Sequence, residues 1–187
     1  MKKIIFASLI LSCVVAGCGS DSNKQNATNQ QPMLERTTRN EVEKAIYASA
    51  DSMMLAFKKQ DWNTFAAFTH PAMVQVMGGT ENLAQLAKQQ MTGLADTVVK
   101  RAEVDSILQV VTVDNELQCL VKQTMVFEQD GNRITSTSYL VGESLNEGKS
   151  WTFFDASNEG KIKPIDIKPN LSTQFNIPRK QQQTTQL

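Results

Sequence analysis

The chain has 187 residues, of which 41% are hydrophobic and 20% are charged, and its 19 basic side chains balance 19 acidic ones. This length is enough for one domain with its own hydrophobic core. A zero net charge supplies no basic field for phosphate groups, which argues against a nucleic-acid-binding protein. The cysteines Cys13, Cys18 and Cys119 indicate no disulfide framework, and no Cys/His cluster has the spacing of metal ligands, so we expect neither a metal nor a cofactor.

Residues 1–17 have the features of a secretory signal peptide: two lysines, then an apolar run, then small residues. The following tetrapeptide, Val15-Ala16-Gly17-Cys18, resembles a bacterial lipobox. This resemblance implies cleavage before Cys18 and attachment of lipid to its thiol, and several acyl chains would hold the protein stably in a membrane. We therefore expect a protein of the cell envelope, anchored to membrane lipid at the outer membrane or the periplasmic face. The alternative is ordinary secretion with an unmodified Cys18.

Residues 18–37 follow as the lipidated cysteine and a tether. From Gly19 to Pro32 the chain contains hardly any apolar residue and cannot bury a face, which predicts a flexible segment. The folded domain is expected over residues 38–177.

The domain begins with a predicted amphipathic helix. Thr38 and Glu41 have the spacing of a capping box, and the helix should continue to about Lys59. Its apolar residues recur at intervals of three to four and form one stripe: Val42, Ile46, Ala50, Met53 and Phe57.

Two further helices are expected before the strands. Asp61 is a suitable N-cap for a short helix from Trp62 to about Thr69, which the pair His70-Pro71 should end. Residues 73–77 form a short apolar run that could be a strand or an edge segment. After Gly78-Gly79, Thr80 should cap the third helix.

From residue 97 onward the pattern predicts an antiparallel meander of four strands. The strands are expected over residues 97–113, 117–128, 133–143 and 150–156, and Asp130-Gly131 indicates a tight hairpin between the second and the third. The segment 161–180 contains several prolines and should form an extended arm along the sheet. Residues 178–187 are predicted to be a disordered tail.

This order of elements, over roughly residues 38–157, resembles the NTF2-like superfamily. The similarity rests on three short stretches: residues 59–68, residues 78–81 and residues 148–155. The resemblance implies an α+β cone in which three N-terminal helices pack on a curved antiparallel sheet of about four main strands. The mouth of such a cone is often a ligand pocket, and many members form homodimers through the sheet. Isomerases, dehydratases, hydrolases and proteins without catalytic activity share this fold, so the fold does not select a function.

Five residues are candidates for a pocket. Tyr47 could donate a hydrogen bond, Glu128 or Asp155 could supply a carboxylate, and His70 is the only histidine of the chain. The aromatic residue Trp62 could line a hydrophobic cavity, although residues of this kind are more commonly part of the core. No catalytic role is assigned to any of them.

Three functions follow as hypotheses. The first is an envelope lipoprotein whose non-catalytic NTF2-like domain binds a small hydrophobic ligand or an envelope protein. The second is an enzyme of the SnoaL or ketosteroid-isomerase type that acts on a hydrophobic small molecule. The third is a dimeric structural or interaction module.

Overall fold

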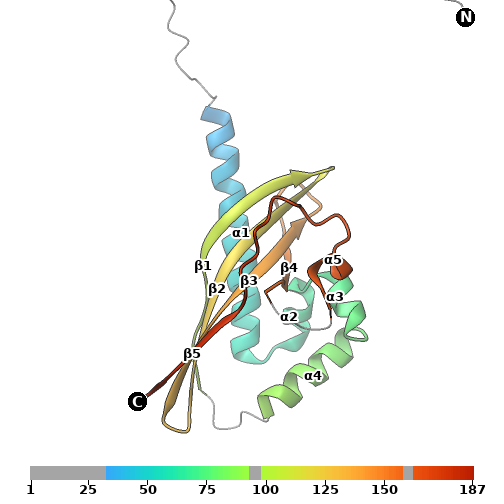
Figure 1. Cartoon of the computed structure of the whole chain (residues 1–187). Coiled ribbons are helices and arrows are strands. Elements are labelled where there is room, and N and C mark those ends of the chain that lie inside the picture. The colour runs from blue at the N-terminus through green and yellow to red at the C-terminus, as the bar shows by residue number, and fades with distance from the viewer. Residues whose placement is uncertain (1–32, 93–97, 158–161) are drawn as a thin grey trace, which may run out of the picture. The chain divides into compact units, whose positions relative to one another are not determined.

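A computed structural model describes residues 33–92, 98–157 and 162–187. The predicted signal peptide, Cys18 and most of the predicted tether lie outside the described residues. In the described part, four helices precede an antiparallel sheet: α1 (Met33–Lys59), α2 (Trp62–Phe68), α3 (Pro71–Val76) and α4 (Thr80–Thr92) (Figure 1). A short helix, α5 (Pro164–Ile167), follows the fourth strand.

The first helix buries the predicted apolar stripe. Ile46 and Ala50 are fully buried, and Met53 is nearly so. The helix begins at Met33, however, so the prediction that it begins at Thr38 is wrong, and residues 33–37 belong to the helix instead of the tether. Residues 34–36 are Leu, Glu and Arg, which all favour helices, so the backbone continues through the expected boundary.

The predicted start of α2 is confirmed in atomic detail. The Asp61 carboxylate accepts hydrogen bonds from the backbone N–H of Thr64 at 3.1 Å and from its hydroxyl at 2.7 Å. These bonds also keep the pKa of the Asp61 carboxyl below its ordinary value. The helix ends at Phe68, just before His70-Pro71, as expected.

The prediction of a strand over residues 73–77 is wrong, because Pro71–Val76 is the helix α3. Proline is well suited to the first turn of a helix, where its missing N–H is not needed. The His70 side chain caps this helix by accepting a hydrogen bond from the backbone N–H of Ala72 at 3.2 Å. The chain then turns at Gly78 and Gly79, whose φ angles of 86° and 96° favour glycine, and enters α4.

The sheet follows the predicted meander and has one more strand than expected. Its first four strands are neighbours in chain order: β1 (Val98–Val113), β2 (Glu116–Gln129), β3 (Asn132–Ser144) and β4 (Thr152–Asp155). The predicted hairpin turn joins β2 and β3, with positive φ at both Asp130 and Gly131. Three register shifts between β1 and β2 interrupt the pairing, and irregularities of this kind bend a sheet (Figure 1).

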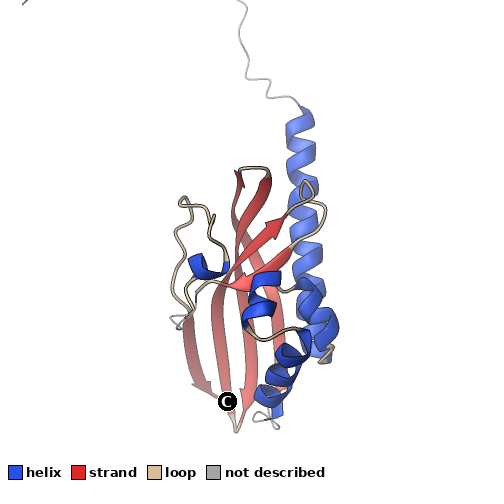
Figure 2. Cartoon of the chain, turned by 90° about the vertical axis from the view of Figure 1, so that its right-hand side faces the viewer, coloured by secondary structure: helices blue, strands red, loops and turns tan. Residues whose placement is uncertain are grey.

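Each face of the sheet is covered in part, by the helices on one side and by α5 and the C-terminal segment on the other (Figure 1 and Figure 2). Alternate residues of β2 serve the two faces: Cys119 and Val121 pack against α1, whereas Leu120 packs on the opposite side. The core on the α1 side includes Trp151 and Phe153. The core on the other side is completed by α5 and by residues 171–177 of the C-terminal arm.

The prediction that residues 178–187 form a disordered tail is also wrong. Residues Gln181–Gln186 form β5, which pairs antiparallel with Asn132–Thr137 of β3. The strand β4 pairs only with residues 140–143 of β3, so β4 leaves the edge of the first half of β3 free. The backbone N–H and C=O groups of β5 form hydrogen bonds with this free edge of β3, and this pairing needs no side chain to be buried. All side chains of β5 are accordingly exposed. The fold is therefore α+β with a curved antiparallel sheet of five strands in the described part of the chain.

Candidate functional site

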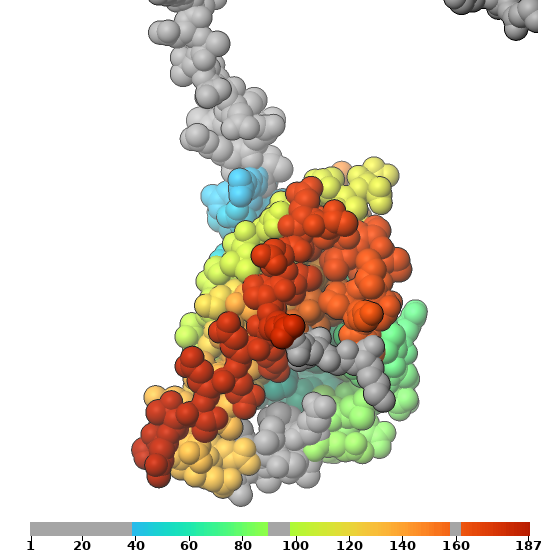
Figure 3. All heavy atoms as spheres, viewed as in Figure 1, coloured from blue at the N-terminus to red at the C-terminus, as the bar shows by residue number. Residues whose placement is uncertain are grey.

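A cavity of about 560 Å³ lies between the helices and the α1 side of the sheet. The space-filling view shows a recess between the C-terminal segment and α4 (Figure 3). Most of the cavity wall is apolar, and its largest side chains are five methionines and five phenylalanines: Met53, Met54, Met73, Met77, Met125, Phe57, Phe65, Phe127, Phe153 and Phe154. A volume of this size suits a small organic molecule. Methionine side chains are flexible and polarizable, so such a wall can adapt to ligands of different shape.

A few polar groups interrupt this wall. The hydroxyls of Thr69, Ser136 and Ser138 and the amide of Gln123 line the cavity, together with the charged residues Asp155 and Lys180. An apolar cavity with few polar groups is the usual form of a binding site for a small molecule.

Asp155 is the predicted site residue that the structure places in the cavity wall. Its carboxylate oxygen Oδ1 accepts hydrogen bonds from the backbone N–H of Ser157 at 2.9 Å and from the Ser157 hydroxyl at 2.6 Å. These bonds shape the end of β4.

Three other predicted site residues lie outside the cavity wall. Tyr47 is partly exposed on α1. Trp62 packs edge-on against Phe57 and Phe65 with ring centroids 5.9 Å and 6.2 Å apart, as core aromatic residues do. Glu128 pairs with basic side chains of β1 and β3, and hydrogen bonds from Lys100 and Arg133 lower the pKa of its carboxyl.

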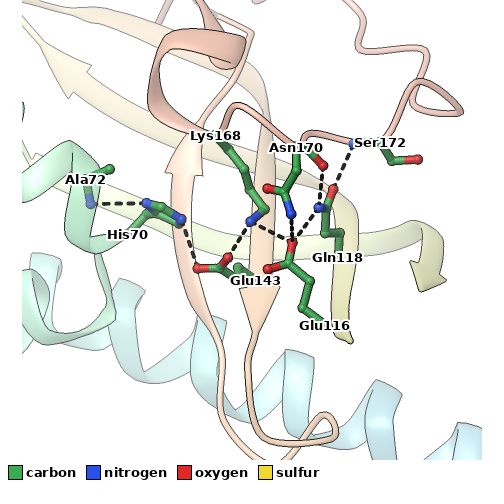
Figure 4. A network of polar contacts seen from close by, with 8 residues as sticks. All are labelled: His70, Ala72, Glu116, Gln118, Glu143, Lys168, Asn170 and Ser172. Atoms are coloured by element: carbon green, nitrogen blue, oxygen red, sulfur yellow. Dashed lines mark hydrogen bonds and ion pairs between the residues drawn. The ribbon is translucent and has the colours of Figure 1, made fainter. Parts of the chain in front are cut away.

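His70 is buried, and it belongs to a different polar cluster (Figure 4). Its Nδ1 accepts the hydrogen bond from Ala72, so the proton of a neutral ring is on Nε2, which lies 2.9 Å from the Glu143 carboxylate. Burial lowers the pKa of His70, and the carboxylate of Glu143 opposes this shift. The ring also packs edge-on against Phe154 at 5.4 Å. The geometry thus favours a neutral histidine that links the start of α3 to the sheet.

Lys168 is the centre of this cluster, and its side chain is only 4% exposed. Its ammonium group contacts the carboxylate of Glu143 and lies 2.6 Å from that of Glu116. These two glutamates are at the ends of β3 and β2, so the lysine joins the C-terminal arm to both strands.

Amide groups extend the cluster along the arm. Gln118 donates to Glu116 at 2.6 Å and to the carbonyl of Asn170 at 2.9 Å, and its own carbonyl accepts from the backbone N–H of Ser172 at 2.9 Å. Burial by itself raises the pKa of Glu116, but the hydrogen bonds from Lys168 and Gln118 outweigh it and lower the pKa overall. We call the set His70, Glu116, Gln118, Glu143, Lys168, Asn170 and Ser172 the arm clamp.

Sequence reasoning missed the arm clamp, apart from naming His70 for another role. Its members come from residues 70, 116–118, 143 and 168–172, and no local motif relates them.

Of the four predicted polar groups, Asp155 lines the cavity, whereas Tyr47 and Glu128 do not, and His70 belongs to the arm clamp. Burial raises the pKa of the Cys119 thiol, which makes it a poor nucleophile. Among the described residues, no group of three or more His, Cys, Asp or Glu side chains could hold a metal ion.

None of the helices in the described ranges is both long enough and apolar enough to cross a membrane. Comparison with models of protein families, with curated proteins and with solved structures finds no match.

Proposed function

We propose that the chain is an envelope lipoprotein whose NTF2-like domain binds a small hydrophobic ligand in the cavity between its helices and its sheet. The observation that carries the proposal is the cavity of about 560 Å³ with its methionine and phenylalanine wall. An apolar hollow of this volume that is partly open to solvent is the usual form of a small-molecule site, and contiguous apolar surface of this kind commonly marks a binding site.

The anchor is part of the proposal and rests on the sequence. The lysines, the apolar run and the lipobox-like residues before Cys18 support a lipid attached to its thiol. The NTF2-like assignment is supported by helices that precede a curved meander and by a long first helix packed along one sheet face. The helices α3 and α5 and the strand β5 are additions to the expected pattern.

Ligand binding is better supported than the two alternatives. An enzyme of the isomerase type needs a base and a hydrogen-bond donor that converge in the pocket, and the predicted candidates lie apart. A homodimer through the outer sheet face would compete with the C-terminal arm, because α5 and residues 171–177 already pack on that face.

The binding proposal is tested with N-phenyl-1-naphthylamine, a neutral dye that fluoresces in apolar sites. The full chain carrying Cys18→Ala should bind the dye, since this variant has no acyl chain that could fill the cavity. Adding Met125→Trp, which puts a bulky ring into the cavity wall, should weaken binding at least tenfold. Leu108→Trp is the matched control, because Leu108 is exposed on β1 and does not line the cavity. Equal dye binding by both tryptophan variants would refute a ligand site in this cavity.

The anchor is tested separately by fractionating cells that express the natural chain or the Cys18→Ala variant. The natural chain should sediment with membranes and the variant should not. A variant that stays with the membrane would refute lipid attachment at Cys18 without affecting the binding proposal.

A further inference from the structure

The cavity contains one buried amide whose hydrogen bonds are weak. Gln123 is in the middle of β2, its side chain lines the cavity, and only 4% of the residue is exposed. A glutamine amide offers two N–H donors and a carbonyl that can accept two hydrogen bonds. Burying such a group among apolar side chains is unfavourable unless good partners satisfy it.

The partners that the structure provides for this amide are poor. Its Nε2 donates to the thioether sulfur of Met54 at 2.9 Å, and sulfur is a weak acceptor. Its carbonyl accepts from the Ser138 hydroxyl at 3.5 Å, which is at the long limit for a hydrogen bond. The amide therefore keeps hydrogen-bonding capacity that a molecule in the cavity could use.

The neighbouring strand places hydroxyl groups beside this amide. Gln123 pairs in register with Ser138, and the next residue of β2 on the same face, Met125, pairs with Ser136. Both serines are buried and line the cavity. Together Gln123, Ser136 and Ser138 form a neutral polar patch on an otherwise apolar sheet surface.

Two charged residues also line the cavity, Asp155 at the end of β4 and Lys180 just before β5. The Asp155 carboxylate accepts hydrogen bonds from Ser157 at the end of β4, and Lys180 is exposed on the C-terminal segment. The patch itself is neutral, so an ionised ligand group bound by Gln123 and Ser138 would lose its hydration without gaining a charged partner from these two residues, which is unfavourable. A hydroxyl or carbonyl group has no such cost.

We infer that the ligand is an uncharged amphipathic molecule, with an apolar body held by the methionine and phenylalanine wall and a hydroxyl or carbonyl group bound by Gln123 and Ser138. This inference rests on the proposed function, since it assigns the class of ligand to the same cavity. The amide can donate to and accept from one such group, so it would select molecules by hydrogen bonding and not by charge.

The test compares three probes of similar size: naphthalene, 2-naphthol and 2-naphthoate. Their affinities are measured by displacement of N-phenyl-1-naphthylamine from the full chain carrying Cys18→Ala. We expect 2-naphthol to bind roughly three- to tenfold more tightly than naphthalene, which corresponds to one net hydrogen bond. The anionic 2-naphthoate should bind more weakly than 2-naphthol.

The variant Gln123→Met keeps the length of the side chain and removes the amide. It should abolish the preference for 2-naphthol and leave the affinity for naphthalene unchanged or stronger. Gln109→Met on β1, which does not line the cavity, is the matched control and should retain the preference. If Gln123→Met does not fold, Ser138→Ala provides the second variant and should reduce the preference in the same direction.

The outcomes separate the inference from the proposed function. If the chain with Gln123 and Ser138 intact bound naphthalene and 2-naphthol with equal affinity, the inference would be overturned and the site would be purely apolar. A preference that survives both Gln123→Met and Ser138→Ala would also overturn it. Tighter binding of 2-naphthoate would indicate an ionic site instead. If no probe and no dye binds, the proposed function itself fails.

Discussion

Replacing Lys168 by methionine should strongly destabilise the fold, because this lysine balances two buried carboxylates. The side chains of Glu116 and Glu143 are 12% and 11% exposed, and both contact the lysine ammonium. Lys168→Met preserves most of the apolar stem but removes the positive charge. Two like charges then remain near each other in a poorly solvated place, with the neutral His70 as the other titratable neighbour.

The size of the effect follows from the burial of the pair. Removing one partner of a buried ion pair typically costs about 3–5 kcal/mol. For a domain of this length, each kcal/mol lowers the melting temperature by about 2–4 °C, so the expected decrease is about 6–20 °C. A surface ion pair contributes much less, about 0–1 kcal/mol.

Urea unfolding, followed by circular dichroism at pH 7.5, measures this difference. Lys149→Met is the matched control, since Lys149 forms a pair with Glu147 in which both side chains are mostly exposed. A second variant, Lys168→Met combined with Glu116→Gln and Glu143→Gln, removes the unpaired charges and should recover part of the lost stability. Hydrogen exchange should also show faster exchange at the amide of Ser172, which the arm clamp holds.

The reasoning would be refuted if Lys168→Met were no more destabilising than Lys149→Met. A triple variant less stable than Lys168→Met alone would likewise contradict the assumption that buried like charges cause the loss.

Three further predictions concern other parts of the fold. Burial lowers the pKa of His70 below its ordinary value of 6.5, so the unfolded chain binds the proton first, and stability should fall as the pH decreases below about 6.5. His70→Gln, which cannot titrate, should show a smaller decrease between pH 7 and pH 5 in urea unfolding, and equal slopes would contradict the assignment. Gly142→Ala should lower the free energy of unfolding by about 1–3 kcal/mol, since its new methyl group would lie 2.6 Å from the Cys119 sulfur and 2.8 Å from the Phe153 ring. Thermal unfolding of Gly142→Ala with and without Cys119→Ala measures this loss. If Cys119→Ala restored none of the lost stability, the clash would not be its cause. Deleting residues 181–187 should speed hydrogen exchange at the β3 amides that pair with β5 and should leave the rest of the sheet protected. Unchanged exchange at these β3 amides would show that β5 is not paired in solution.

Much of the fold could be predicted because its signals are local. The stripe from Ile46 to Met53 repeats every three to four residues, and this spacing alone places one face of α1 in the core. Asp61 caps α2 through bonds to a residue three positions ahead, and Asp130-Gly131 makes its turn within two residues. At residues 73–77 the short apolar run suggested a strand or an edge segment, and this was wrong because a run of this length also fits a single turn of helix.

The candidate site was less predictable from the sequence. Of the predicted pocket residues, Asp155 lies in the cavity wall, and His70 caps a helix and contacts Glu143. The burial of Gln123 could not be predicted, because the sequence pattern of a strand with apolar residues on both faces does not show whether a given glutamine is exposed or buried. Its role arises from the strand register, which sets it opposite Ser138 and faces both toward the helices.

The sequence by itself determined most of the helices and strands and predicted a lipid attached at Cys18, since both are encoded in short runs of residues. The tertiary structure alone decided three things: the arm clamp, the pairing of β5 and the apolar cavity. Each depends on groups far apart in the chain, such as Gln118 and Ser172, which are 54 residues apart. Such contacts form because buried charges and backbone polar groups need partners in the folded state. These partners are distant in the chain, so no periodic pattern in the sequence predicts them.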